Sequence, residues 1–404
     1  MLVSPFAFYR GAALIMASDV AATPQSGLRV QLCGDAHLSN FGVFASPDRH
    51  LVFDLNDFDE TLPGPWEWDV KRLAASLAVA GREREFKAKQ RERIVAGAVR
   101  AYRTAMREFS GMGNLAVWYA RLDTESLIAD YGANLDRKLT KRGERDLAKA
   151  RTKDSMKAFE KLTTTVDGEP RIASDPPLIV PLRELLEGVD HEQMVNSIHG
   201  LLRAYASSLP PDRQALLAQY RFVDMARKVV GVGSVGTRAW VMLMLGRDGG
   251  DPLFLQAKEA QASVLEEFAG RSRHRNSGKR VVVGQWLMQA ASDILLGWER
   301  AAGLDRAERD FYVRQLKDWK GSAEIERMLP AGMEIYARMC GWTLARAHAR
   351  SGDRIAIASY LGKSDAFDRA LVKFAEDYAD QNERDYRALQ EAVASGRLAA
   401  ETGL

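Results

Sequence analysis

The chain has 404 residues and a net charge of +3, and 46% of its residues are hydrophobic and 27% charged, as in an ordinary globular protein. So small a net charge gives no reason to expect a nucleic-acid partner, and no stretch approaches the 18 apolar residues of a membrane span. The two cysteines, Cys33 and Cys340, form no CxxC pair, which argues against a disulfide framework or a cysteine zinc site. We therefore expect a soluble, cytoplasmic protein that binds neither nucleic acid nor membrane.

The first half of the chain passes from β structure to helix. Residues 28–62 predict strands, namely LRVQLC, then FGVFA and HLVFDL joined by the turn SPDR. Residues 66–108 carry apolar side chains at three- and four-residue spacing, the pattern of helices. The charged stretch from about 115 to 215 is expected to be helical too, interrupted by a loop at DGEPRIASDPP.

A second β-rich stretch begins near residue 219. Five segments predict strands there: ARKVV, RAWVMLML, LFLQAK, LLGWER and DFYVRQL. ASVLEEF and VVVGQWLMQAASD predict helices between them, and helical periodicity returns over 323–397. Because the strands are too few for a doubly wound sheet, this order indicates an α+β fold.

The densest chemistry lies in CGDAHLSNFG and LVFDLNDFDE. These two segments hold the catalytic candidates Asp35 and His37 and the possible metal ligands Asn40, Asp54 and Asp57. Two further acids, Asp59 and Glu60, follow in the second segment. Carboxylate and amide oxygens at strand ends suit Mg²⁺, and a hairpin would bring Asn40 and Asp54 to one ion. Asp35 would then lie beside the metal as a base for an incoming hydroxyl. A single acid in such a loop could equally cap a turn, but the whole set favours a function.

GDAHLSN resembles the catalytic loop of aminoglycoside and choline phosphotransferases, whose pattern is His-Gly-Asp-x-x-x-x-Asn, and LVFDLND resembles their metal-binding strand. The resemblance implies that Asp35 is the catalytic base and that Asn40 and Asp54 bind magnesium. Asp57, in NDFD, is a competing register for the second ligand. Cys33 departs from the pattern, because those enzymes have a histidine there that supports the loop backbone.

Two more positions have possible roles beside this loop. Asp69, in GPWEWDVKRLAAS, matches an acid that opens the next helix in those enzymes, which implies a structural role. Arg10, in FYRG, could reach a phosphate or an acid of the loop, although an ordinary salt bridge explains it equally well.

A glycine-rich turn, Gly231-Val-Gly233-Ser234-Val-Gly236, lies between two predicted strands, and a third strand ends in Lys258. A dinucleotide-binding fingerprint would require a helix directly after the glycines, whereas TRAWVMLML is a strand pattern. In kinases, the glycine loop covers the phosphates of ATP and a lysine of the third strand neutralises them. We interpret Lys258 in this way, although a lysine that protects an edge strand is the simpler alternative.

Two residues would complete this nucleotide site. Glu266, or Glu267 beside it, is the acidic candidate nearest in sequence to pair with Lys258. Gln315 follows the fifth strand, where a kinase hinge would bind adenine through backbone hydrogen bonds.

The order of these motifs is the reverse of that in a kinase, because the catalytic loop precedes the glycine loop. GWTLARAHARSG, near the C-terminus, resembles the phosphotransferase helix that normally leads to the catalytic loop. A circular permutation accounts for both observations. We therefore predict a permuted, two-lobed kinase-like fold, with a β-rich small lobe at 217–320 and a large helical lobe from 1–216 and 321–404.

The predicted function is transfer of a phosphoryl group from Mg-ATP to an unidentified hydroxyl or amine acceptor. A pseudokinase-like nucleotide-binding regulator and a nucleotidyl transferase remain alternatives. Nearly the whole chain, from SPFAFYRG through FDLNDFDETLPGPWEWD to LARAHARSGD, also resembles an uncharacterised bacterial family of unknown function, and that resemblance implies no substrate.

Overall fold

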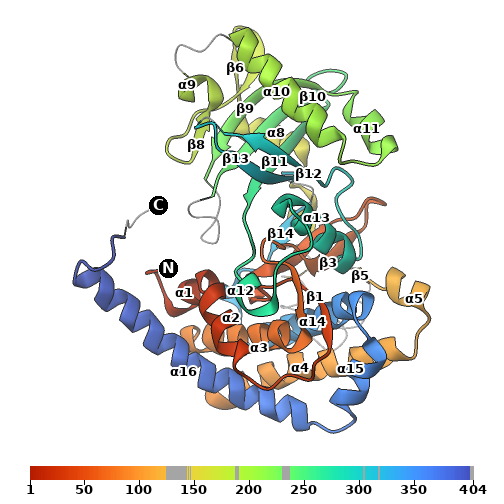
Figure 1. Cartoon of the computed structure of the whole chain (residues 1–404), viewed down its shortest axis with the longest axis vertical. Coiled ribbons are helices and arrows are strands. Elements are labelled where there is room, and N and C mark those ends of the chain that lie inside the picture. Colours follow the sequence, from red (N-terminus) through yellow and green to blue (C-terminus); the bar gives the residue numbers. More distant parts are fainter. Residues whose placement is uncertain are drawn as a thin grey trace.

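The computed structural model describes residues 1–123, 143, 145, 147–186, 191–229, 237–303, 305–316 and 319–400, with 191–195 described by their backbone alone. The fold is α+β, as expected. Figure 1 shows a β-rich part at one end of the molecule and a helical part at the other. No helix in the described ranges is long and apolar enough to cross a membrane.

The β-rich part is built on a six-stranded antiparallel sheet with the order β12-β13-β11-β10-β9-β8. Its strands are β8 (Ile179–Pro181), β9 (Arg221–Lys228), β10 (Ala239–Leu245), β11 (Pro252–Ala260), β12 (Gly297–Ala302) and β13 (Glu308–Gln315). The last five are the strands predicted from sequence. The edge strand β8 was missed, because it lies in the stretch that was expected to be helical apart from one loop. The helical expectation is also wrong at β6 (Thr163–Val166), which forms a hairpin with β7 (Glu169–Ile172), a strand within the expected loop.

Each face of this sheet is covered by different elements. On one face, Val241, Leu243 and Phe254 pack with the hairpin and with α8 (Ser155–Leu162). On the other face, Met242 and Leu255 pack under α10 (His191–Ala206). The remaining helices near the sheet are α9 (Leu182–Leu185), α11 (Pro211–Leu217), α12 (Glu266–Ala269) and α13 (Ser277–Met288). A helix was expected through ASVLEEF, but only its end is helical, as the four-residue α12.

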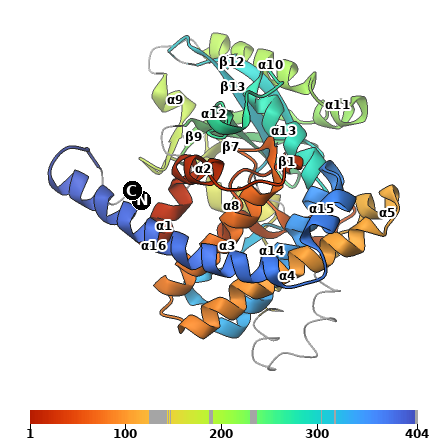
Figure 2. The ribbon, with the colours of Figure 1, turned by 60° about the horizontal axis from the view of Figure 1, so that its bottom comes forward.

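The helical part is assembled from both ends of the chain. It contains α1 (Pro5–Gly11), α2 (Ala13–Ala21), α3 (Trp66–Glu83), α4 (Ala88–Ser110), α5 (Asn114–Tyr119), α14 (Pro330–Ser351), α15 (Arg354–Leu361) and α16 (Ala366–Ala394). Figure 2 shows the long α16 running across α3. The side chain of Asn382 donates to the carbonyl of Pro5 at 3.1 Å, and the hydroxyl of Tyr386 donates to that of Leu2 at 2.8 Å. The N-terminal and C-terminal helices are thus joined directly.

Two small antiparallel sheets position the acidic loops. β1 (Arg29–Leu32) pairs with β4 (Leu62–Pro65), and β2 (Phe41–Ala45) pairs with β3 (Leu51–Leu55), with β14 (Gly321–Ser322) and β5 (Leu122–Asp123) at the edges. β2 and β3 are the hairpin predicted from sequence. Residues 33–40 leave β1 and residues 56–61 leave β3, so both acidic segments begin where a strand ends.

Candidate active site

The side chain of Lys258, on β11, contacts the acidic segment that follows β3. Its ammonium lies 2.8 Å from Oδ2 of Asp59, and the hydroxyl of Tyr312 donates to Oδ1 of the same carboxylate at 2.6 Å. Lys258 is 5% exposed, whereas the side chain of Asp59 is 34% exposed, so water reaches the ion pair from the carboxylate side. Glu266, the partner expected from sequence, is not the partner that the structure gives: α12 is too short and lies beside β4 and α2.

Three cations surround Asp57, two residues before Asp59. Burial would raise the pKa of Asp57, but Lys258, Arg314 and Lys320 together hold it below its usual value. Lys320 is itself affected, because burial and the charge of Arg314 lower its pKa to about 7. Three basic side chains thus gather at Asp57, and such a cluster favours an anionic ligand.

Neither Arg314 nor Lys320 was predicted from sequence as a site residue. The alternation of side chains along the strands could have indicated Arg314. In the register of β11 and β13, Lys258 pairs with Tyr312 and Gln256 pairs with Arg314. These four side chains therefore share one face of the sheet. Lys320 lies in the connection to β14 and carries no comparable pattern.

Asp54 and Asp57 differ in what their oxygens contact. Oδ1 of Asp54 accepts from the guanidinium of Arg346, and Oδ2 accepts from the backbone N–H of Ala290 at 2.8 Å. Both oxygens of this buried carboxylate are therefore engaged. In Asp57, Oδ1 accepts from the backbone N–H of Asp59 at 3.2 Å, and no bond within the described residues involves Oδ2. Of the two registers considered from sequence, Asp57 is the one with an oxygen free for a ligand.

Asp35 and Asn40 are brought together by the turn between them. The side-chain amide of Asn40 donates to the carbonyl of Asp35 at 2.7 Å, which directs its amide oxygen away from that bond. Oδ1 of Asp35 accepts from Nε of Arg72 at 2.8 Å, and Nε2 of His37 lies 3.5 Å from Oδ2. The Arg72 guanidinium also stacks 3.9 Å over the Tyr9 ring, which fixes its position.

His37 is neutral at neutral pH in this setting. Burial lowers the pKa of His37 to about 4. The charge of Asp35 raises this pKa, whereas the nearby cations Arg72 and Arg10 lower it further. Nδ1 of His37 accepts from the backbone N–H of Ser39 at 3.2 Å, which leaves the proton on Nε2, facing Asp35. The buried Nε of Arg10 has no hydrogen-bond partner in the part of the chain described here.

The backbone of the Asp35 loop is held by Asp69, at the start of α3. Its carboxylate accepts from the N–H groups of Cys33 at 2.8 Å and Gly34 at 3.1 Å, and it lies 3.2 Å from Nε2 of His348. Asp69 thus has the structural role that the sequence suggested, and the histidine beside it comes from α14. Gly34 has φ +86°, and a Cβ there would lie 2.2 Å from the Glu60 carbonyl, so the loop requires glycine.

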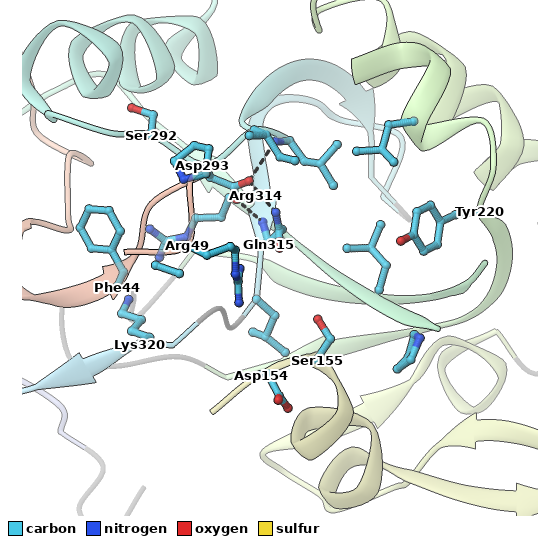
Figure 3. Close-up of a pocket in the computed structure, with 18 of the residues that line it drawn as sticks. Phe44, Arg49, Asp154, Ser155, Tyr220, Ser292, Asp293, Arg314, Gln315 and Lys320 are labelled. Carbon is cyan, nitrogen blue, oxygen red and sulfur yellow. Dashed lines mark hydrogen bonds between the residues drawn. The ribbon is translucent and has the colours of Figure 1, made fainter. Parts of the chain in front are cut away.

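A cavity of about 480 Å³ lies at the end of β13 and is lined by Arg314 and Lys320, but not by Lys258, Asp57, Asn40 or Asp35. Figure 3 shows Arg49, Arg314 and Lys320 on its wall, with Asp293 beside Gln315. The backbone N–H of Gln315, expected to face adenine, donates instead to Oδ2 of Asp293 at 2.5 Å. The turn of Gly231, Gly233, Ser234 and Gly236 lies outside the described residues.

No group of three or more His, Cys, Asp and Glu side chains in the described ranges could hold a metal ion. Asn40 and Asp57 offer one amide oxygen and one carboxylate oxygen. Such a pair fits Mg²⁺ only when phosphates and waters complete its coordination. The donors present therefore suit a metal that arrives with a nucleotide.

A family model described as "uncharacterized protein conserved in bacteria (DUF2252)" matches residues 1–392. The chain belongs to this family. Membership confirms the second resemblance drawn from the sequence and assigns no substrate. Comparisons with curated proteins and with solved structures found no match.

Proposed function

We propose that this protein transfers a phosphoryl group from Mg-ATP to a hydroxyl or amine acceptor, on a two-lobed, circularly permuted kinase-like scaffold. The observation that carries the proposal is the contact of Lys258 with Asp59. It joins β11, the second strand after the glycine-rich turn, to the acidic segment that follows β3, 199 residues earlier in the sequence. These are the two groups that a kinase needs on opposite sides of the triphosphate.

The residues divide into three roles. Lys258, Arg314 and Lys320 would neutralise the phosphates. Asn40 and Asp57 would hold Mg²⁺, which when bound neutralises charge on the β- and γ-phosphate oxygens. Asp57 replaces Asp54 here, because both oxygens of Asp54 already accept hydrogen bonds.

Asp35 would act on the acceptor. The acceptor oxygen or nitrogen attacks the γ-phosphorus, the bond from that phosphorus to the ADP oxygen breaks, and the acceptor proton passes to Asp35. Arg72 holds one oxygen of Asp35 in place. Arg10 lies close enough to the neutral His37 to affect its pKa, and the buried Nε of Arg10, which has no hydrogen-bond partner among the described residues, suits an acceptor that carries a negative charge.

The contact between the chain ends supports the permutation. α1 and α16 are hydrogen-bonded to each other. A related chain could therefore connect these two helices directly and have its termini at another position, with the same core. α14 contributes Arg346 to Asp54 and His348 to Asp69, and both acids flank the catalytic loop. This is the position expected of the helix that leads to that loop in phosphotransferases.

Product analysis tests the proposal. Incubated with Mg-ATP and no added acceptor, the protein should release ADP by slow hydrolysis or self-modification, and Asp35→Asn should lower that rate by about 10²-fold or more. ATP affinity of Asp35→Asn should change by less than about tenfold, because Asp35 acts on the acceptor. Release of AMP and pyrophosphate would establish the nucleotidyl transferase instead. Binding of ATP with no turnover, unaffected by Asp35→Asn, would establish the pseudokinase.

A further inference from the structure

A second and larger cavity, of about 750 Å³, lies on the opposite face of the six-stranded sheet. It is enclosed between the sheet and helices α9 and α10. Most of its lining is apolar, including Leu201, Met225, Trp240, Ala301 and Phe311. This volume and this lining are those of small-molecule binding sites in proteins. None of the residues assigned to phosphoryl transfer lines the cavity.

Two carboxylates are among the lining residues, that of Glu299 on β12 and that of Asp305, which is paired with Arg238. Glu299 lies directly opposite Phe311 in the register of β12 and β13, so both side chains point to the cavity face. Its Oε2 is buried and has no hydrogen-bond partner within the described ranges. Burial raises the pKa of Glu299 to about 7. A buried oxygen without a partner destabilises a fold unless a ligand or water satisfies it.

The other polar groups of the cavity do not satisfy Glu299. The hydroxyl of Tyr205 donates to the Leu295 carbonyl. Arg238 is paired with Glu259 at 3.3 Å and with Asp305 at 3.2 Å. The two remaining arginines of the lining, Arg227 and Arg306, are exposed to solvent, and no ion pair to Glu299 is found in the part of the chain described.

We propose that this cavity binds an apolar small molecule that carries a protonated amine, with the amine donating to Glu299. The apolar lining would bury the body of the ligand, and the amine would supply both the missing donor and the opposite charge. A charge-assisted N–H···O bond in a site of low polarity is roughly twice as strong as a neutral one. A neutral alcohol would supply the hydrogen bond to Glu299 but not the opposite charge. The carboxylate of Glu299 would repel a ligand that carries a carboxylate.

The cavity is independent of the proposed phosphoryl transfer but is attached to the same strand. Ala257 lines the cavity, whereas Lys258, the next residue on β11, contacts Asp59 on the other face. A ligand in the cavity therefore touches the strand that positions Lys258. Its binding can be measured without ATP, so failure of either proposal leaves the other standing.

Displacement of the fluorescent amine N-phenyl-1-naphthylamine from the full-length protein tests the inference. Hexylamine, hexanol and hexanoate share one chain length, so they isolate the contribution of the head group. Hexylamine should displace the dye at concentrations at least about tenfold lower than hexanoate, with hexanol between them. Glu299→Gln should reduce the amine preference to within about threefold, and Glu308→Gln, an exposed site on the same sheet, should leave it unchanged.

A second variant shows where the dye binds. Ala301→Phe reduces the cavity volume from within the lining and should weaken dye binding at least about tenfold, with the far-UV circular dichroism unchanged. Tight dye binding that survives Ala301→Phe would overturn the inference. Equal displacement by hexylamine and hexanoate, or a preference for hexanoate, would overturn the role of Glu299.

Discussion

The ammonium of Lys258 lies 2.8 Å from Oδ2 of Asp59, although 199 residues separate the two in sequence. Burial alone would lower the pKa of Lys258, but Tyr312, Asp59 and Asp57 hold it above its usual value. The lysine therefore stays charged although its own side chain is buried. The ammonium of Lys258 lies near the carboxylates of Asp57 and Asp59. When a nucleotide binds, it can give up part of its contact with these carboxylates and contact phosphate oxygens instead.

Replacement of Lys258 by Met should weaken Mg-ATP binding by about tenfold or more, because the ammonium contacts phosphate in the ground state. Asp59→Asn should lower turnover by about tenfold while ATP affinity changes less, because Asp59 positions the lysine. Glu266→Gln, the matched control from the same region of the chain, should alter neither. Calorimetry and an ADP-release assay measure the two effects, and a large loss in Glu266→Gln would restore the pairing expected from sequence.

Asp54→Asn and Asp57→Asn should have opposite effects on stability and binding. Asp54→Asn leaves Arg346 buried without its counter-ion, which should cost about 3–5 kcal/mol of unfolding free energy, and Arg346→Met should cause a similar loss. Asp57→Asn should fold normally and lose the Mg²⁺ dependence of ATP binding. Urea denaturation and calorimetry with and without Mg²⁺ check this, and full Mg²⁺ dependence in Asp57→Asn would exclude it as a ligand.

Much of this site was predictable from sequence because its groups lie within short segments. The β2–β3 hairpin, the loop from Asp35 to Asn40 and the strand ending in Lys258 all follow local patterns of alternation and turns. The choice between Asp54 and Asp57 was not predictable, because it depends on Arg346, which comes from the other end of the chain. For the same reason, a local acid, Glu266, was preferred to the distant Asp59.

The fold shows the same limit. β8 is three residues long and contains a proline, so it lacks the alternation that marks a strand, and only its pairing with β9 reveals it. Arg314 could have been found once the register of β11 and β13 was known. Lys320 stands in an irregular connection, and only the folded structure brings it to Asp57.

ATP binding should take up a proton, because the pKa of Lys320 is about 7 in the free protein. Phosphate oxygens beside this amine would raise its pKa, so at pH 8 the complex should gain close to one proton, and affinity should fall as pH rises above 7. Arg314, Lys258 and Asp57 also face Lys320, but the pKa of each is shifted further away from this range.

Calorimetry in buffers of different ionisation enthalpy measures the proton directly. Lys320→Met should abolish the uptake, and Lys373→Met, at an exposed site on α16, should retain it. Binding by the wild type without any proton uptake would show that Lys320 does not contact the phosphates.

Glu299 should make stability depend on pH. Its pKa is raised from 4.5 to about 7 by burial, so between these values the unfolded carboxyl is ionised while the folded one keeps its proton. The free energy of unfolding should therefore fall as pH rises, by at most about 1.4 kcal/mol per unit. Urea denaturation from pH 4.5 to 7.5 measures the slope. Glu299→Gln should flatten it relative to Glu308→Gln, and identical slopes in the two variants would contradict the assignment.

A crystal structure with Mg²⁺ and a non-hydrolysable ATP analogue would show where the nucleotide lies, and this is the most direct test of phosphoryl transfer at this site. We predict that phosphate oxygens lie within about 3 Å of the Lys258 ammonium. The metal should lie about 2.1 Å from oxygens of Asn40 and Asp57, and the γ-phosphate should face Asp35. A nucleotide bound away from Lys258, or one whose α-phosphate rather than γ-phosphate faces Asp35, would contradict phosphoryl transfer at this site.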